Sequence, residues 1–193
     1  MGDVPPADYV HALAVSADDA HTPAVPVDDA HAPAVPVDDA HALAVPVDDA
    51  HALAVRVADA MFARDRASQA LGMRILAVAP GSARLSMRVR ADMLNGHAIC
   101  HGGFIFTLAD STFAFACNSR DLATVASACT IDFLAPAREG DVLTAAAIER
   151  SIGGRMGVYD IEVTNLCGDT IALFRGKSYR VGGHVIDPGA RDA

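Results

Sequence analysis

The pattern of apolar and polar residues divides the chain near residue 57. Before this point a ten-residue unit, best preserved as PVDDAHALAV, recurs with its Asp and His in register. Prolines recur within the unit and interrupt any continuous helix. Its side chains are too small and too polar to build a large apolar face. We therefore expect residues 1–56 to be a low-complexity repeat tail, disordered or extended.

From residue 57 onward the pattern is that of a folded domain. Apolar residues at helical spacing predict a helix over residues 58–71, which ends at Gly72. Two strands are predicted over 74–80 and 82–91, separated by the turn signal Pro80-Gly81. The second strand alternates apolar residues with Ser and Arg, which is typical of a half-buried antiparallel strand with a basic outer face.

The next segment, residues 103–118, is apolar nearly all round and predicts a buried helix. Three or four further strands follow, separated by turns that contain glycine, over residues 123–134, 141–151, 158–165 and 170–181. This order fits an antiparallel sheet wrapped around one long central helix, an α+β fold. The domain then spans residues 57–183, and residues 184–193 form a flexible carboxyl-terminal tail.

The net charge of −9 belongs to the amino-terminal repeats. Residues 1–56 carry ten Asp and one Arg, and the remaining acids and bases are equal in number. With a single Lys in the chain and no basic cluster, a nucleic-acid surface is not expected. No apolar run reaches the roughly 18 residues of a membrane span, and the start lacks the basic and apolar parts of a secretory signal. The four Cys form no CxxC pair, so we expect small buried hydrophobes in a reduced, cytoplasmic protein.

The segment LNGHAICHGGFIFTLAD, residues 94–110, has the residues for acyl-transfer chemistry. Gly102 and Gly103 stand at the start of the buried helix, where N–H groups are unpaired and the helix dipole is positive. Such a position can hold a developing oxyanion. Asp110 follows among apolar residues, where burial should raise its pKa into the range of a general base. The alternatives are a tight loop-to-helix turn at the glycines, and a buried acid that is hydrogen-bonded to a strand or a hydroxyl.

The spacing of these residues has a geometric consequence. Gly102 and Asp110 are eight residues apart, so they are separated by about 12 Å along one helix axis. One carbonyl group cannot contact both residues. If both act on one substrate, two helices must lie side by side, which predicts a two-fold dimer with two composite sites.

The strings MLNGHAICHGGFIFTLADSTFAFACNS, VASACTIDFLAPAREGDVLTA, GVYDIEVTN and ALFRGKSYRVGG closely resemble the PaaI phenylacetate-degradation thioesterases of the hotdog superfamily. The resemblance covers roughly residues 58–183 and includes HGG followed after seven residues by Asp, with Asn six residues before the His. It implies the hotdog fold and dimers assembled into tetramers. It also implies hydrolysis of phenylacetyl-CoA and its ring-hydroxylated relatives to the free acid and CoA, with no metal or cofactor.

The resemblance also suggests a role for individual residues. Asp110 matches the catalytic acid, a general base or a nucleophile, and Gly102 matches the residue whose N–H polarises the thioester carbonyl. Asn95 matches a residue that helps to hold the carbonyl or the water. The substrate-binding candidates are the loop-positioning His101, Gly103, Thr130 on a strand expected to line the acyl pocket, and Lys177 and Arg180 for the phosphates of CoA.

Other functions remain to be weighed against this one. A hotdog dehydratase or hydratase, or a module that binds acyl-CoA without hydrolysing it, would use the same fold. A serine hydrolase is disfavoured because the chain has no GxSxG motif. His97 and His101, or the His and Asp of the repeats, could be read as metal ligands. The glycine-containing loop and the wide repeat spacing argue against both readings.

Overall fold

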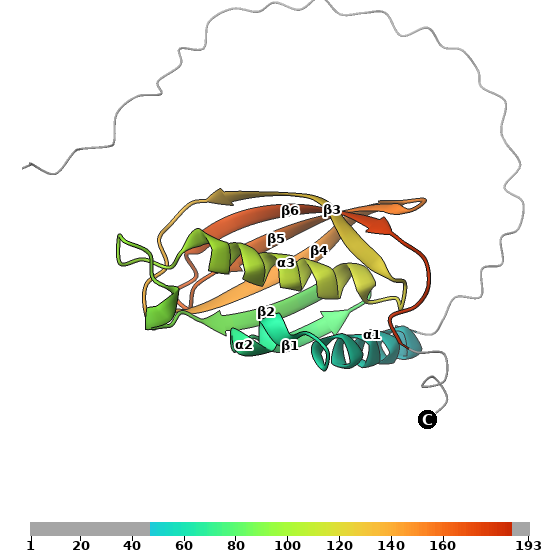
Figure 1. Ribbon diagram of the computed structural model, residues 1–193. Coiled ribbons are helices and arrows are strands. Elements are labelled where there is room, and N and C mark those ends of the chain that lie inside the picture. Colours follow the sequence, from blue (N-terminus) through green and yellow to red (C-terminus); the bar gives the residue numbers. More distant parts are fainter. Residues whose placement is uncertain (1–46, 187–193) are drawn as a thin grey trace, which may run out of the picture. The chain divides into compact units, whose positions relative to one another are not determined.

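A six-stranded antiparallel sheet curves around one long helix in residues 47–186, the part of the chain that this computed structural model describes (Figure 1). The helices are α1 (Val47–Phe62), α2 (Arg66–Ala70) and α3 (Gly102–Asn118), with a 3-10 turn η1 (Ala91–Met93). The strands are β1 (Arg74–Ala79), β2 (Ser82–Arg88), β3 (Thr124–Phe133), β4 (Val142–Gly153), β5 (Met156–Thr164) and β6 (Thr170–Arg180). The predicted α+β arrangement around a central helix is confirmed.

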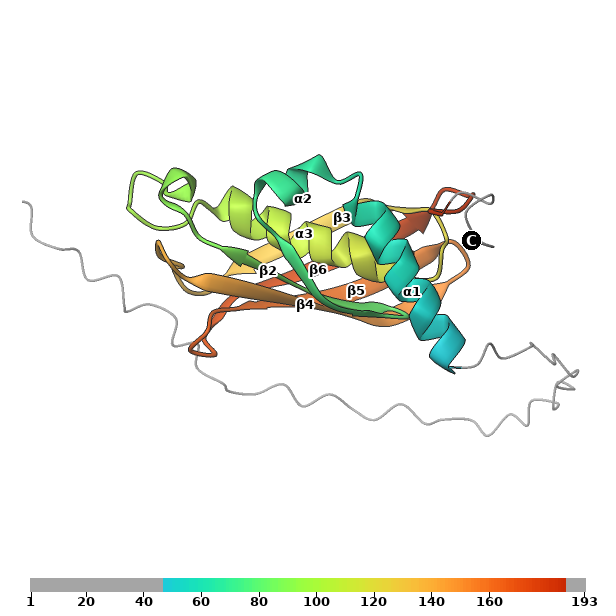
Figure 2. The ribbon, with the colours of Figure 1, turned by 90° about the horizontal axis from the view of Figure 1, so that it is seen from below.

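The strand order is β1-β2-β4-β5-β6-β3, so β3 lies at one edge of the sheet and pairs only with β6 within the described chain. All neighbouring strands are antiparallel. The connection through α3 carries the chain from β2, near one edge, to β3 at the other. Figure 2 shows α2 on the same side of the sheet as α3, whereas α1 runs obliquely across the edge of the sheet beside β1. We call the side of the sheet opposite α3 its outer face.

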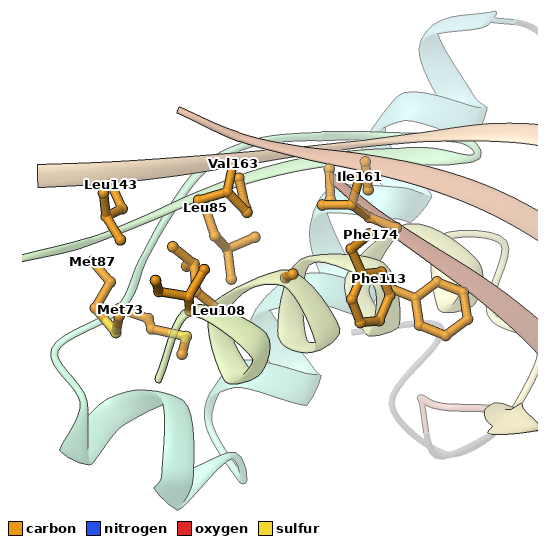
Figure 3. Packing of buried hydrophobic residues seen from close by; sticks show 14 of the residues in the cluster. Met73, Leu85, Met87, Leu108, Phe113, Leu143, Ile161, Val163 and Phe174 are labelled. Atoms are coloured by element: carbon orange, nitrogen blue, oxygen red, sulfur yellow. The ribbon is translucent and has the colours of Figure 1, made fainter. Parts of the chain in front are cut away.

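Strand β2 has the alternating burial that its sequence predicts. Its predicted inward positions Ala83, Leu85 and Met87 are each at most 2% exposed, whereas Arg84 and Arg88 are exposed. The apolar side chains of β2, β4, β5 and β6 converge on α3, where Leu108 and Phe113 fill the centre of the core (Figure 3).

Gly176 on β6 allows α3 to approach the sheet closely. A Cβ atom at this position would lie 2.9 Å from three atoms of the Phe113 ring. That ring is buried and packs between Tyr159 and Phe174, with ring centroids 5.3 and 6.2 Å away. Because its neighbours surround it, the ring has little room to move aside.

We therefore expect Gly176→Ala to lower the free energy of unfolding by about 1–3 kcal/mol through overpacking. Thermal denaturation followed by circular dichroism would measure the change. Gly153→Ala is the matched control, because a Cβ there meets nothing within 4 Å. Equal melting temperatures for the two variants would contradict this account of Gly176.

Helix α1 begins earlier than the sequence indicated. It starts at Val47, directly after Pro46, and so includes ten residues assigned above to the repeat tail. Two Asp in its first turn favour the positive end of the helix, and Ala54 and Val57 are 0% exposed. The predicted helix over 58–71 is two helices, because Asp65 caps α2 by accepting from the Ser68 N–H. A truncation that keeps the packed helix therefore starts at Val47.

The first residues assigned to a flexible carboxyl-terminal tail are held in place. The buried Asp121 carboxylate accepts from the backbone N–H groups of Val185 and Ile186, both at 2.9 Å. The Arg64 guanidinium donates to the Val185 carbonyl at 2.9 Å. These contacts join positions far apart in sequence, so no local pattern predicted them. The rest of the predicted tail, 187–193, and residues 1–46 lie outside the described part.

Candidate active site

Helix α3 has a strip that the rest of residues 47–186 does not cover, and Asp110 lies on it. Most of the helix is buried, but Gly103 is exposed, and Phe106, Asp110 and Ala114 are only half-buried. Residues three and four apart share one side of a helix. The expectation of a helix buried all round therefore needs correction along this strip.

The surroundings of Asp110 suit a proton acceptor. Burial raises the pKa of its carboxyl above the ordinary value, and a contact with the Cys129 thiol lowers it by a smaller amount. The Sγ atom of Cys129 lies 3.9 Å from Asp110 Oδ1. Within residues 47–186 no Arg, Lys or His forms an ion pair with this carboxylate. A carboxylate that is partly desolvated and not paired with a cation keeps its basicity.

The start of α3 offers one free N–H donor rather than the pair expected from the sequence. His101 is the N-cap, and its Nδ1 accepts from the Gly103 N–H at 3.0 Å. The Gly102 N–H has no acceptor in the described part of the chain. Because an unpaired N–H at a helix N-terminus favours a negatively charged oxygen, Gly102 keeps the geometry for an oxyanion and Gly103 does not. His101 caps the start of α3 through this contact.

Gly102 is also a position where space is limited. A Cβ atom there would lie 2.9 Å from Cζ of Phe133 and within 3.4 Å of two further ring atoms. Phe133 stands at the end of β3 and is 53% exposed. The aromatic ring thus lies directly against the glycine whose N–H is free.

Asn95 organises the loop that leads to α3. Its Oδ1 accepts from the backbone N–H groups of His97 at 2.9 Å and Ile99 at 3.4 Å. The backbone N–H of Asn95 donates to the Ile99 carbonyl at 2.9 Å. The Oδ1 atom is therefore committed to the turn, and Nδ2 has no acceptor in the region described. The amide can offer Nδ2 as a second donor to a ligand.

Three predicted substrate-binding residues do not gather around Asp110. Side chains alternate between the faces of a strand, and Cys129 faces α3, so Thr130 points to the outer face. Thr130 pairs there with Arg175 across the strands. Lys177 also lies on the outer face, whereas Arg180 lies further along β6 and on the side of α3. Lys177 and Arg180 therefore do not form one basic patch.

The four aromatic residues of α3 fall into two groups. Phe113 and Phe115 are each 1% exposed and belong to the core. Phe104 and Phe106 are half-buried, and Phe106 stands one turn before Asp110 with its ring 5.3 Å from that of Phe174. Of these rings, Phe106 is the one placed to contact an acyl group held at Asp110.

The sequence offers two sets of residues as possible metal ligands, one in the loop before α3 and one in the repeats. Within the described range, no group of three or more His, Cys, Asp or Glu could hold a metal ion. His101 is used as a helix cap through Nδ1. The His and Asp of the decamer units before residue 47 lie outside the described residues.

Two residues of the site were not identified from the sequence. Cys129 was interpreted as a small hydrophobe, yet it is the residue whose side chain contacts Asp110. Phe133 belongs to the strand expected to line the acyl pocket but is not singled out by the sequence, yet it lies against Gly102. The alternation Cys129, Ile131, Phe133 on one side of β3 was the signal available, because it places three apolar residues toward the helix.

Comparison with known proteins identifies the family of this chain. The protein-family model described as "Thioesterase superfamily" matches residues 97–172 of this chain. The chain is 56% identical over 125 residues to acyl-coenzyme A thioesterase PaaI of Escherichia coli (strain K12), covering 65% of this chain and 89% of the relative. It is 40% identical over 121 residues to a putative esterase of Archaeoglobus fulgidus, covering 63% and 79%.

Solved structures agree with the sequence relatives. The structure of the E. coli PaaI protein from the phenylacetic acid degradation operon matches with a TM-score of 0.69 at 54% identity, covering 69% of this chain and 97% of that one. The TT0310 protein of Thermus thermophilus matches with a TM-score of 0.59 at 42% identity, covering 61% and 99%. The predictions of a hotdog fold and of a thioester hydrolase are confirmed, and the chain belongs to the thioesterase superfamily.

Proposed function

We propose that the protein is an acyl-CoA thioesterase that hydrolyses phenylacetyl-CoA and its ring-hydroxylated relatives to the free acid and CoA. The observation that carries the proposal is Asp110, a half-buried carboxylate without a cationic partner in the described chain, on the uncovered strip of α3. The free Gly102 N–H supplies the second element of the chemistry. The similarity to E. coli PaaI supports both the acyl-CoA substrate and the place in phenylacetate breakdown.

In the reaction, a water molecule attacks the carbonyl carbon of the thioester while Asp110 takes one of its protons. Charge develops on the carbonyl oxygen, where the Gly102 N–H donates a hydrogen bond. The tetrahedral intermediate then collapses, the carbon–sulfur bond breaks, and the CoA sulfur takes the proton back from Asp110. Asn95 Nδ2 is available as an additional donor to the oxygen or to the water.

Both groups can act on one substrate only if two chains combine. Gly102 and Asp110 lie on the same helix, about 12 Å apart along its axis. We propose a two-fold dimer in which Gly102 of one chain faces Asp110 of its partner. The uncovered strip of α3 supports this arrangement, because a second α3 would cover it.

The edge strand β3 supports the same dimer. An edge strand presents unpaired N–H and C=O groups to a further strand, and β3 carries exposed Val125 (49%) and Phe133 (53%). Pairing of β3 with a second β3 would extend the sheet and bring the two α3 helices together. We propose further assembly to a tetramer through the outer face, where Ile148 and Leu173 are about half exposed.

We propose that the acyl group lies against Phe106 and that Arg180, on the side of α3, contacts a CoA phosphate. All four Cys are free, which agrees with a reducing compartment, and we place the reaction in the cytoplasm. In the part of the chain with described structure, no helix is both long and apolar enough to cross a membrane.

Release of free thiol from a panel of acyl-CoA esters tests the function. We expect fast release from phenylacetyl-CoA and hydroxyphenylacetyl-CoA, and slow release from benzoyl-CoA and straight-chain acyl-CoA. Fast release from straight chains alone would overturn the aromatic substrate. No release from any ester, with the protein folded and dimeric by sedimentation, would favour a module that binds acyl-CoA. Hydration of an enoyl-CoA without thiol release would favour a hydratase.

A further inference from the structure

The thiol of Cys129, on the sheet, lies within hydrogen-bond range of Asp110. Cys129 lies on β3 opposite Gly176 of β6, where it faces α3. Its Sγ is 3.9 Å from Asp110 Oδ1, within the range of a hydrogen bond that involves sulfur. No other side chain in residues 47–186 has a hydrogen bond to this carboxylate. Oδ1 is therefore held from the strand side, and Oδ2 is left without a partner in those residues.

We propose that Cys129 is a positioning residue, whose S–H holds Asp110 Oδ1 and leaves Oδ2 to take the proton of the attacking water. The inference rests on the proposed function, in which Asp110 is the general base. Without such a contact the carboxylate of a half-buried Asp could rotate about its last bond, and the water would meet either oxygen. A fixed oxygen lowers the cost of reaching the reactive geometry.

A thiol suits this position because it is a weak donor. A strong donor such as Arg, Lys or a backbone N–H would stabilise the carboxylate and reduce its basicity. The contact with Cys129 lowers the pKa of Asp110 less than burial raises it. The S–H thus fixes the direction of the carboxylate and preserves the basicity that its burial produces.

The arrangement also keeps the thiol from reacting. Burial raises the pKa of Cys129 to about 11, and the charge of Asp110 raises it as well. The other titratable group coupled to Asp110 in the described chain is Cys117 on α3, whose pKa burial raises to about 12. Both thiols therefore stay protonated near neutral pH. Since the thiolate is the nucleophilic form, Cys129 can stand beside a thioester without exchanging with it.

The pH dependence of kcat/KM for phenylacetyl-CoA tests the proposal. The S–H contact lowers the pKa of Asp110, so its removal in Cys129→Ala raises that pKa, and the acidic limb of the profile moves to higher pH. Cys129→Ser keeps a donor and should return the limb toward its original position. Cys167→Ala, which removes an exposed thiol in the turn after β5, should leave the profile unchanged. Lower activity in Cys129→Ala with an unmoved acidic limb would overturn the proposal in favour of packing alone.

Alkylation by iodoacetamide tests the contact without any need for activity. Because the charge of Asp110 raises the Cys129 pKa, Asp110→Asn should make Cys129 react severalfold faster. Trypsin releases Cys129 in the peptide DLATVASACTIDFLAPAR, which holds no other cysteine, and Cys167 in the same sample is the internal reference. An equal ratio of Cys129 to Cys167 modification in both proteins would contradict the contact. If no thioester is hydrolysed, the proposed function fails, but this ratio still decides whether Cys129 and Asp110 interact.

Discussion

Replacement of Asp110 by Asn is expected to lower kcat for phenylacetyl-CoA by about 10²–10⁴-fold, the contribution of a general base. Asn has the same shape but cannot accept the proton of the attacking water. Binding should persist, because the Gly102 N–H and the acyl pocket are unchanged. Thiol release would give kcat. Titration with a thioether analogue of the substrate, which cannot be hydrolysed, would show whether affinity is retained.

The same substitution should not destabilise the protein at neutral pH. Burial raises the pKa of Asp110 in the folded state, so its stabilising contribution is present at low pH and is lost as the pH rises through that raised pKa. Above that pH the ionised carboxylate opposes folding, and the uncharged Asn removes this cost. The melting temperature of Asp110→Asn at pH 7 should therefore equal or exceed that of the original protein.

Asp59→Asn is the matched control, because Asp59 is an exposed acid on α1. It should retain full turnover. Full turnover in Asp110→Asn as well would exclude Asp110 as base or nucleophile. A loss of turnover accompanied by a lower melting temperature or by dissociation of the dimer would show that Asp110 acts on structure rather than on chemistry.

The fold was predictable where burial repeats with the period of a single element. The alternation in β2 and the continuous apolar character of α3 placed both elements within a few residues of their observed bounds. The start of α1 was not predictable in this way. The repeat unit 46–55 is identical to the unit 36–45, and only its proximity to the core distinguishes it. Ala54 is buried because the sheet and α3 stand behind it, which local composition cannot show.

The candidate site was predictable where it depends on backbone position and less so where it depends on side-chain direction. Gly102 and Asp110 follow from the motif and from their place on one helix. Thr130 is expected to line the acyl pocket from the strand over residues 123–134, but it points to the outer face, and its neighbour Cys129 is the residue that faces Asp110. The loss of Gly103 as a donor depends on the rotamer of His101, which no spacing rule gives.

Gly102→Ala is the second substitution expected to have a large effect, a loss of about 10²-fold in kcat/KM through misplacement of the reacting groups. Alanine keeps the N–H, so the loss would come from space. The new Cβ would lie 2.9 Å from the Phe133 ring and beside the donor that the thioester oxygen must reach. Gly96→Ala is the control in the preceding loop, because a Cβ there meets nothing within 4 Å. It should retain turnover.

A second change separates the two ways in which this Cβ can act. In Gly102→Ala combined with Phe133→Ala, the clash between the Cβ and the ring is absent, but the Cβ still stands beside the N–H. If the methyl group obstructs the thioester oxygen, the double variant recovers its melting temperature and remains slow. If the methyl group acts only by displacing Phe133 and the start of α3, the double variant turns over as fast as Phe133→Ala alone. The double-mutant cycle then shows strong coupling between the two positions. Recovery of turnover would assign the importance of Gly102 to packing against β3 and would remove the steric argument for an oxyanion at its N–H.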